Sequence, residues 1–183
     1  MPKREEKPLQ AADERSRFEE AVLPHLGAAY NLARWLTRDD HDAEDVVQES
    51  YLRALKSFAG FHGGDGRAWL LAIVRNACYT WLEKKRGRQP ATPFDEAVHT
   101  LDSGSVAPDT LLRQKEDREA VHEAVAALPV DLREVVVLRE LEGFSYKEIA
   151  AIANIPMGTV MSRLARAREQ LQKRLTEYAD KGS

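Results

Sequence analysis

Cysteine is almost absent from this sequence, and its scarcity limits the kinds of protein that the chain can encode. The only cysteine among the 183 residues is Cys78. An internal disulfide framework is therefore excluded, and a reducing compartment such as the cytoplasm is favoured. Because Cys78 lies near an apolar helix face, we expect a buried small side chain rather than a redox sensor.

Long apolar runs and an excess of charge of one sign are also missing. No uncharged apolar stretch is long enough to cross a membrane and no secretory leader is present, so we expect a cytosolic protein without membrane insertion. The chain has only 10 glycines and 8 prolines, and no convincing run of β-branched residues alternates with polar ones as in a β-strand. An all-α fold is therefore predicted. The formal net charge is only −3, so any affinity for nucleic acid must come from local basic patches.

The residues from Ser145 to Leu171 predict a helix, a tight turn and a second helix. Ser145 and Glu148 have the spacing of a capping box at the start of the first helix. Asn154 tolerates the left-handed conformation that ends a helix, and Pro156 favours the first turn of the next one. At about 100° per residue, the second helix should bury one narrow arc. This arc contains Val160, Leu164, Ala167 and Leu171.

The opposite face of the second helix carries hydroxyl groups near its start and cations further along. Five basic residues and one acidic residue lie between positions 157 and 175, which makes this stretch net +4. Such a face suits a helix that touches base edges while its flanks hold phosphates, although an ordinary solvated helix of a bundle is the alternative. The candidate DNA-reading residues are Thr159, Ser162, Arg166 and, at the border of the face, Arg163.

The rest of the chain divides into four segments. Residues 1–12 are charged and contain proline, so a disordered tail is predicted. A first helical domain is expected over 13–88, and it should begin with an amphipathic helix that Pro24 kinks or divides. A flexible linker is expected over 89–108, where Pro, Gly, Ser and Thr gather. The second domain, over 109–180, should contain four helices and end with the helix-turn-helix.

An acidic stretch in the first domain has two interpretations. Six acids and no lysine or arginine lie between Asp39 and Glu49. Acids near a helix start are stabilised by the helix dipole, which explains part of the run. The helical wheel also places Leu52 on the polar face, ringed by Asp45, Gln48 and Glu49. An apolar anchor with a polar rim is typical of a protein-docking surface, but a single exposed leucine is also ordinary.

A glycine-rich loop over 60–66 and the basic helix after it form a second candidate site. The loop lacks the spacing of a phosphate-binding motif. The helix after it ends in a basic cluster, and residues 67–88 are net +5. Aromatic and amide side chains beside cations can hold an unpaired base, whereas a basic last turn can also simply stabilise its own helix. The candidate residues are Phe61, Arg75, Asn76, Lys84 and Arg86.

Three segments together resemble the extracytoplasmic-function (ECF) sigma factors, the compact two-domain members of the bacterial sigma-seventy family. The resemblance covers about residues 15–177, in the right order and with a linker where the family has one. It implies a dissociable specificity subunit of RNA polymerase that binds promoter DNA and has no catalytic residue, metal or cofactor. The segments that carry it are DAEDVVQESYLRAL, then FAGF with RAWLLAIVRNACYTWLEKKR, and LPVDLREVVVLRELEGFSYKEIAAIANIPMGTVMSRLARAREQL.

The resemblance also implies a role for each candidate residue. In the family, the first domain docks on the clamp helices of the polymerase β′ subunit, and this role falls on Asp45, Gln48, Glu49 and Leu52. The first domain also reads and helps to open the minus-ten element, which falls on the group from Phe61 to Arg86. The second domain reads the minus-thirty-five element with the face from Thr159 to Arg166, and contacts the β flap. Most members are also held inactive by an anti-sigma protein.

Two residues depart from the family pattern. Met161 replaces a residue that is very often basic, so one contact to phosphate or base is in doubt. Asn154 replaces the usual glycine of the turn, but asparagine can adopt the same conformation.

Three other classes of protein fit the sequence less well. A stand-alone helix-turn-helix regulator explains residues 145–171 but not the acidic helix, and a purely protein-binding adaptor does not explain the hydroxyl-plus-arginine face. An enzyme fits worst, because the histidines are scattered and no metal-ligand or nucleophile motif is present. The histidines are His25, His41, His62, His99 and His122.

Overall fold

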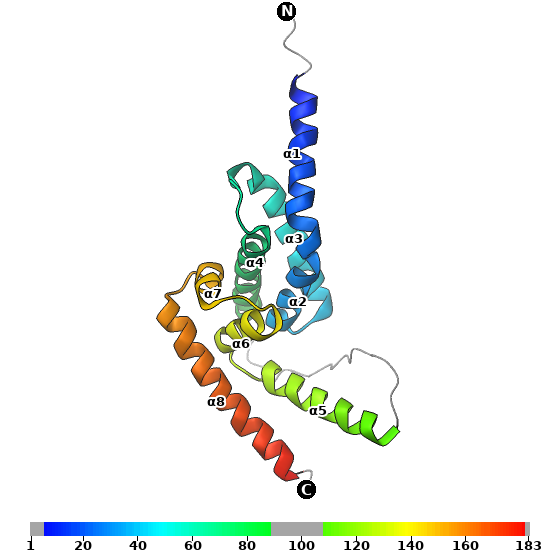
Figure 1. Cartoon of the computed structure of the whole chain (residues 1–183), viewed down its shortest axis with the longest axis vertical. Coiled ribbons are helices and arrows are strands. Elements are labelled where there is room, and N and C mark those ends of the chain that lie inside the picture. The colour runs from blue at the N-terminus through cyan, green and yellow to red at the C-terminus, as the bar shows by residue number, and fades with distance from the viewer. Residues whose placement is uncertain (1–5, 89–107, 182–183) are drawn as a thin grey trace, which may run out of the picture.

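The computed structural model describes residues 6–88 and 108–181, and over these residues the secondary structure is helical throughout (Figure 1). This confirms the predicted all-α class. Within the same residues, no helix combines the length and apolarity needed to cross a bilayer. The first domain contains α1 (Glu6–Val22), η1 (Leu23–His25), α2 (Leu26–Thr37), α3 (Asp40–Ser57), η2 (Phe58–Gly60) and α4 (Gly66–Arg88). The second contains α5 (Pro108–Ala126), α6 (Val130–Val136), η3 (Val137–Leu141), α7 (Tyr146–Ala153) and α8 (Met157–Lys181).

The first helix differs from the predicted one at both ends. It starts at Glu6 rather than near Asp13, so its first turns occupy part of the segment predicted to be a disordered tail. Pro8 lies in the first turn, where a helix tolerates proline because the N–H groups there have no partner within the helix. Pro24 divides the remainder, as predicted: α1 ends at Val22, a short 3₁₀ turn follows, and α2 starts at Leu26.

The first domain packs α2, α3 and α4 around a core that is rich in aromatic residues. Phe18 of α1 lies edge-on to both Tyr51 and Phe58, with ring centroids 5.2 Å apart in each pair. Gly66 starts α4 against α1, where a Cβ atom would lie 2.5 Å from the backbone oxygen of Ala21. Only glycine can occupy this position without a shift of the backbone, so α4 is held close to α1.

The helix-turn-helix forms as the sequence predicts. The Ser145 hydroxyl accepts from the backbone N–H of Glu148, whose side chain accepts from the backbone N–H of Ser145. This capping box starts α7, and hydrogen bonds from Ser145 lower the pKa of Glu148. Asn154 ends the helix in the left-handed region at φ 52° and ψ 51°, and Gly143 is left-handed at φ 72°. The predicted buried arc of α8 is confirmed at Val160, Leu164 and Ala167, while Leu171 is half-buried.

A buried arginine joins the first two helices of the second domain. The Arg133 side chain donates to the backbone oxygens of Ala126, the last residue of α5, and of Leu128, two residues after it, at 2.5 and 3.1 Å. These carbonyls have no acceptor role within α5, so the arginine satisfies them. Burial lowers the pKa of Arg133 to about 10.

The two domains pack directly against each other. In Figure 1, α6 and α7 lie between the first domain and α8, while α5 and α8 form the end of the molecule opposite α1. Contacts between the domains join α4 to α7 and α2 to α6, and the buried apolar residues of both domains form one continuous cluster. The predicted linker over 89–108 lies outside the described residues, except for Pro108, which begins α5. Residues far apart in the sequence therefore meet at this boundary.

Candidate functional site

The acidic helix α3 presents its predicted docking residues to solvent. Asp39 caps the helix by accepting from the backbone N–H of Asp42 at 2.9 Å, so the acidic run begins with an ordinary N-cap. Beyond this first turn, the polar face is exposed and carries an ion pair between Glu49 and Arg53 at 2.5 Å. On this face Leu52 is 54% exposed. The exposed predicted residues are Asp45, Gln48, Glu49 and Leu52.

A second leucine on this face was missed by sequence reasoning. Leu55 is 46% exposed, three residues after Leu52 and therefore next to it on the helix surface. The two leucines make an apolar pair within a charged surface. The signal was present in the spacing, but the helical wheel drew attention only to the residue directly opposite the buried arc.

The glycine-rich loop is anchored to the fold by its aromatic and acidic residues. Phe61 stacks on Phe58 at a centroid distance of 5.6 Å and lies 4.8 Å from Trp69 of α4. The Asp65 carboxylate accepts from the backbone N–H of Arg67 at 2.9 Å, which caps α4. Phe61 is therefore half-buried in an aromatic cluster, whereas residues 62–65 of the loop are exposed.

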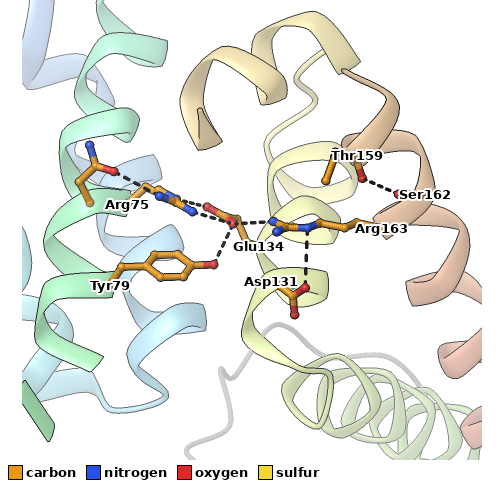
Figure 2. Close-up of polar contacts among 8 residues, drawn as sticks. Arg75, Tyr79, Asp131, Glu134, Thr159, Ser162 and Arg163 are labelled. Atoms are coloured by element: carbon orange, nitrogen blue, oxygen red, sulfur yellow. Dashed lines mark hydrogen bonds and ion pairs between the residues drawn. The ribbon is translucent and has the colours of Figure 1, made fainter. Parts of the chain in front are cut away.

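Arg75 of α4 points across the domain boundary to Glu134 of α6, as Figure 2 shows. Its Nε donates to one carboxylate oxygen at 2.5 Å, and its Nη2 lies 3.5 Å from the other. Its Nη1 donates to the side-chain oxygen of Asn76 at 3.3 Å, and the guanidinium lies over the Tyr79 ring at 3.9 Å. This predicted base-capture residue is thus engaged within the protein, whereas its neighbour Asn76 is exposed.

Glu134 is the centre of this polar group, and the sequence did not single it out. Its side chain is fully buried, and besides Arg75 it accepts from the Tyr79 hydroxyl at 2.9 Å (Figure 2). Burial raises the pKa of Tyr79, and the negative charge of Glu134 raises it further, so the phenol stays a donor. For Arg75, burial opposes the charged form, but the hydrogen bond and charge of Glu134 outweigh it and raise the pKa. No signal in the sequence distinguished Glu134 from the other acids.

The predicted DNA-reading face of α8 is divided by the structure. Ser162 and Arg166 are exposed, Thr159 is half-buried, and the Ser162 hydroxyl donates to the Thr159 backbone oxygen at 3.1 Å. The Arg163 side chain is only 19% exposed and turns toward α6, with ion pairs to Asp131 at 3.7 Å and Glu134 at 3.8 Å (Figure 2). The helical wheel placed Arg163 at the border of the DNA-reading face. In the structure its side chain is directed toward the protein.

The basic end of α4 leaves two of its predicted residues exposed. Lys84 and Arg86 both face solvent. Lys85, between them, turns back to Asp42 of α3 at 3.6 Å and lies over the Trp81 ring at 4.5 Å. The exposed cations therefore lie at the end of α4 beyond the residues engaged with Glu134.

In the part of the chain that the structure describes, no three His, Cys, Asp or Glu side chains gather as metal ligands.

Two family profiles match the chain, one in each domain. The profile described as Sigma-70 region 2 matches residues 21–88, and the one described as Sigma-70, region 4 matches residues 118–171. Curated relatives include the ECF RNA polymerase sigma-E factors of Salmonella typhi, 38% identical, and Escherichia coli K12, 37% identical, each over 141 residues. These alignments cover 73% of this chain and 74% of each relative. The ECF sigma factor SigE of Mycolicibacterium smegmatis is 31% identical over 162 residues, covering 88% of this chain and 63% of that protein.

Solved structures have the same fold. The sigma factor RpoE of Bartonella quintana, solved in complex with the anti-sigma factor NepR, superposes with a TM-score of 0.69 and 32% sequence identity. That alignment covers 87% of this chain and 97% of the other. CnrH, solved with the cytosolic domain of CnrY, has a TM-score of 0.61, and the alignment covers 92% of this chain and 94% of the other. At 24% identity, this second likeness concerns the fold alone.

Proposed function

Because the chain belongs to the ECF sigma factors of the sigma-seventy family, which are non-enzymatic subunits that direct transcription initiation by RNA polymerase, we propose how its surfaces divide that task. The exposed face of α3 docks on the clamp helices of the polymerase β′ subunit. The loop after α3 and the exposed side of α4 capture a non-template base of the minus-ten element. The face of α8 reads the minus-thirty-five element, while the second domain leans on the β flap.

The docking role is supported by the surface of α3. Leu52 and Leu55 are both about half exposed on a helix whose other exposed residues are mostly charged. The exposed parts of these two neighbouring leucines are available to a partner, and a central apolar contact with a charged rim is how protein interfaces are built. The residues proposed to hold the polymerase are Asp45, Gln48, Glu49 and Leu52.

The DNA-reading roles are supported by exposure and charge. Ser162 and Arg166 face solvent on α8, where the start of a recognition helix meets base edges. Phe61, Asn76, Lys84 and Arg86 provide an aromatic ring, an amide and two cations, the groups that stack on and bind an unpaired base. Arg75, Arg163 and Thr159 complete the proposed set, but they have less exposure to support them, because Thr159 is half-buried and both arginines form ion pairs with Glu134.

An anti-sigma protein is proposed as a second partner. The similar RpoE of Bartonella quintana was solved in complex with the anti-sigma factor NepR. This chain is 32% identical to it and superposes over nearly all of that protein. We therefore propose that a protein of this class binds the present chain and controls its access to polymerase.

Run-off transcription with core polymerase tests the proposed function. Promoter-specific RNA should appear from fragmented genomic DNA only when the chain is added to core enzyme. Leu52→Glu should abolish core binding and transcription while leaving helicity unchanged, because it places a charge in the docking contact. Leu23→Glu is the matched control: Leu23 is 45% exposed but belongs to η1 rather than to the docking helix α3, so its replacement should leave activity intact. Unchanged core binding in Leu52→Glu would remove the docking assignment.

A further inference from the structure

Two exposed methionines lie at the start of α8, the helix that the proposed function assigns to duplex DNA. Met157 and Met161 are 52% and 51% exposed. They are four residues apart, so their side chains are neighbours on the helix surface. Ala165, four residues further on, is exposed as well, and the three residues form one line along the helix. We call Met157, Met161 and Ala165 the apolar row.

The apolar row runs beside the polar residues that are proposed to read DNA. Ser162 lies three residues before Ala165, the spacing of neighbours on a helix surface, and Arg166 continues the polar side. The stretch over 157–175 is net +4, which suits an anionic partner. In Figure 1 the first turns of α8 lie beside α7 at the outer edge of the molecule. The surface that is offered to DNA is therefore partly apolar.

A methionine side chain cannot bind DNA in the way that a basic residue does. Its thioether has no N–H or O–H to donate, so it makes no strong contact to a phosphate or to the acceptor atoms of a purine. In the major groove, the thymine C5-methyl group is the feature of a base edge that matches an apolar side chain. Methionine suits this contact, because its unbranched, polarisable side chain adapts to an irregular surface.

The spacing of the two methionines fits the spacing of bases. Residues four apart on an α-helix are separated by about 6 Å along its axis. Successive bases of one strand rise by about 3.4 Å, so about 6 Å spans fewer than two base-pair steps. Met157 and Met161 can therefore meet thymines at adjacent or next-adjacent positions of one site.

We propose that Met161, together with Met157, makes this chain select thymine in its upstream promoter element by contacting C5-methyl groups in the major groove. This inference rests on the proposed function, because it requires that α8 reads duplex DNA. It adds a specificity that hydroxyl and guanidinium groups do not provide. At position 161, where the sequence departs from the family pattern, an apolar contact thus replaces a charged one.

Replacement of thymine by uracil tests the proposal one methyl group at a time. Holoenzyme formed from the full chain and core polymerase first selects promoter fragments from a library in which the upstream segment is randomised. Each thymine of the selected segment is then replaced in turn by uracil, which pairs in the same way but lacks the methyl group. We expect uracil at one or two positions to weaken wild-type binding about fourfold, the effect of one buried methyl group.

The variant Met161→Ala identifies the side chain that makes the contact. Met161 is exposed and alanine favours helices, so the fold should be kept. At one of the sensitive positions the variant should bind the thymine and uracil fragments equally well, whereas Met161→Leu should keep the preference. Leu141→Ala is the matched control, because Leu141 is 52% exposed but lies in η3, and the fourfold ratio should persist. The same uracil penalty in Met161→Ala as in the wild type would overturn the proposal.

The variant Met161→Arg tests whether position 161 faces DNA. The added cation should steepen the dependence of holoenzyme binding on salt by about one unit of slope. It should also abolish the penalty for uracil at the position that Met161 contacts. An unchanged salt slope would place this side chain away from DNA and would contradict the proposal.

The same measurements separate this proposal from the proposed function. A selected upstream sequence that depends on Arg166 but not on thymine methyl groups contradicts the role of the apolar row alone. Weaker core binding by Met161→Ala, with no uracil penalty in the wild type, would make the row a protein contact and would also overturn the proposal. If no upstream sequence is selected, the reading role of α8 is contradicted, and the role of the apolar row with it.

Discussion

The imidazole of His122 stacks on the indole of Trp35 across the domain boundary, with ring centroids 4.6 Å apart and planes tilted by 37°. His122 belongs to α5 and Trp35 to α2, so the stack is a contact between the domains that is separate from the ion pair of Arg75 and Glu134. Burial lowers the pKa of His122, and the positive charges of Arg34 and Arg38 lower it further, while Glu123 opposes them. The packed arrangement therefore favours the neutral imidazole.

Acid should loosen the packing of the two domains. Because the pKa of His122 lies below 6.5 when the domains are packed and near it when they separate, the separated state binds the proton first. The free-energy advantage that the packed state gains from a neutral His122 is therefore fully present above about pH 6.5, and it decreases as the pH falls. FRET between dyes at Lys56→Cys in α3 and Lys173→Cys in α8 should report a longer distance at about pH 5.5 than at neutral pH.

The ring of His122 provides the control for this pH effect. His122→Phe keeps an aromatic ring over Trp35 but cannot take up a proton in this range. Its interdomain distance should change less with pH than that of the wild type. An equal response in both proteins would assign the effect to other groups.

Arg163 and Arg166 should behave differently although they are neighbours on α8. Arg163→Ala removes the cation between Asp131 and Glu134, and should lower the free energy of unfolding by about 1–3 kcal/mol because buried polar atoms lose a partner. Arg166→Ala changes an exposed residue and should alter stability by less than about 0.5 kcal/mol. Urea unfolding followed by circular dichroism measures both.

For recognition of promoter DNA the order should be reversed, and the exposed Arg166 should matter more than Arg163. Arg166→Ala should weaken recognition of the upstream element by about 1–3 kcal/mol if it makes a bidentate contact to a base. If it contacts only phosphate, the loss should be uniform across sequences and the salt slope should fall by about one. An Arg163→Ala protein as stable as Arg166→Ala would show that the ion pairs of Arg163 contribute nothing.

The local features of the fold were predictable because each depends on a few neighbouring residues. The capping box of Ser145 and Glu148, the break at Pro24 and the left-handed Asn154 all follow from the chemistry of one turn. The exposed position of Leu52 followed from helical periodicity alone. These signals are encoded within a few positions and need no knowledge of the rest of the chain.

The ion pair of Arg75 and Glu134 was not predictable, because it depends on how the two domains pack. Glu134 lies 59 positions from Arg75, and nothing near it distinguishes it from other glutamates. Arg163 sits at the border of its helix, so the wheel could not decide whether it faces DNA or protein. Its direction is set by Asp131 and Glu134 on α6, which the periodicity of α8 does not contain.

Cys78 should be unreactive in the folded chain. It is fully buried, and burial raises the pKa of its thiol to about 12, so almost no thiolate is present near pH 8. Alkylation by iodoacetamide should be slow in buffer and fast in urea, where the thiol regains its ordinary pKa. Cys78→Ala/Ser162→Cys is the control, because Ser162 is exposed on α8 and its replacement should react at once. Equally fast labelling of Cys78 in the native wild type would contradict the buried assignment.

The turn of the helix-turn-helix should depend on the left-handed backbone of Asn154. A residue with a Cβ atom costs about 1–2 kcal/mol in this region, asparagine tolerates it better than most, and glycine pays almost nothing. Asn154→Ala should therefore lower the free energy of unfolding by about 1 kcal/mol, whereas Asn154→Gly should preserve it or raise it slightly. Ala165→Gly, at an exposed position inside α8, should instead destabilise by about 0.5–1 kcal/mol. Since φ is 52° at Asn154, glycine has opposite effects at the two positions, and thermal unfolding of the three variants measures this difference directly.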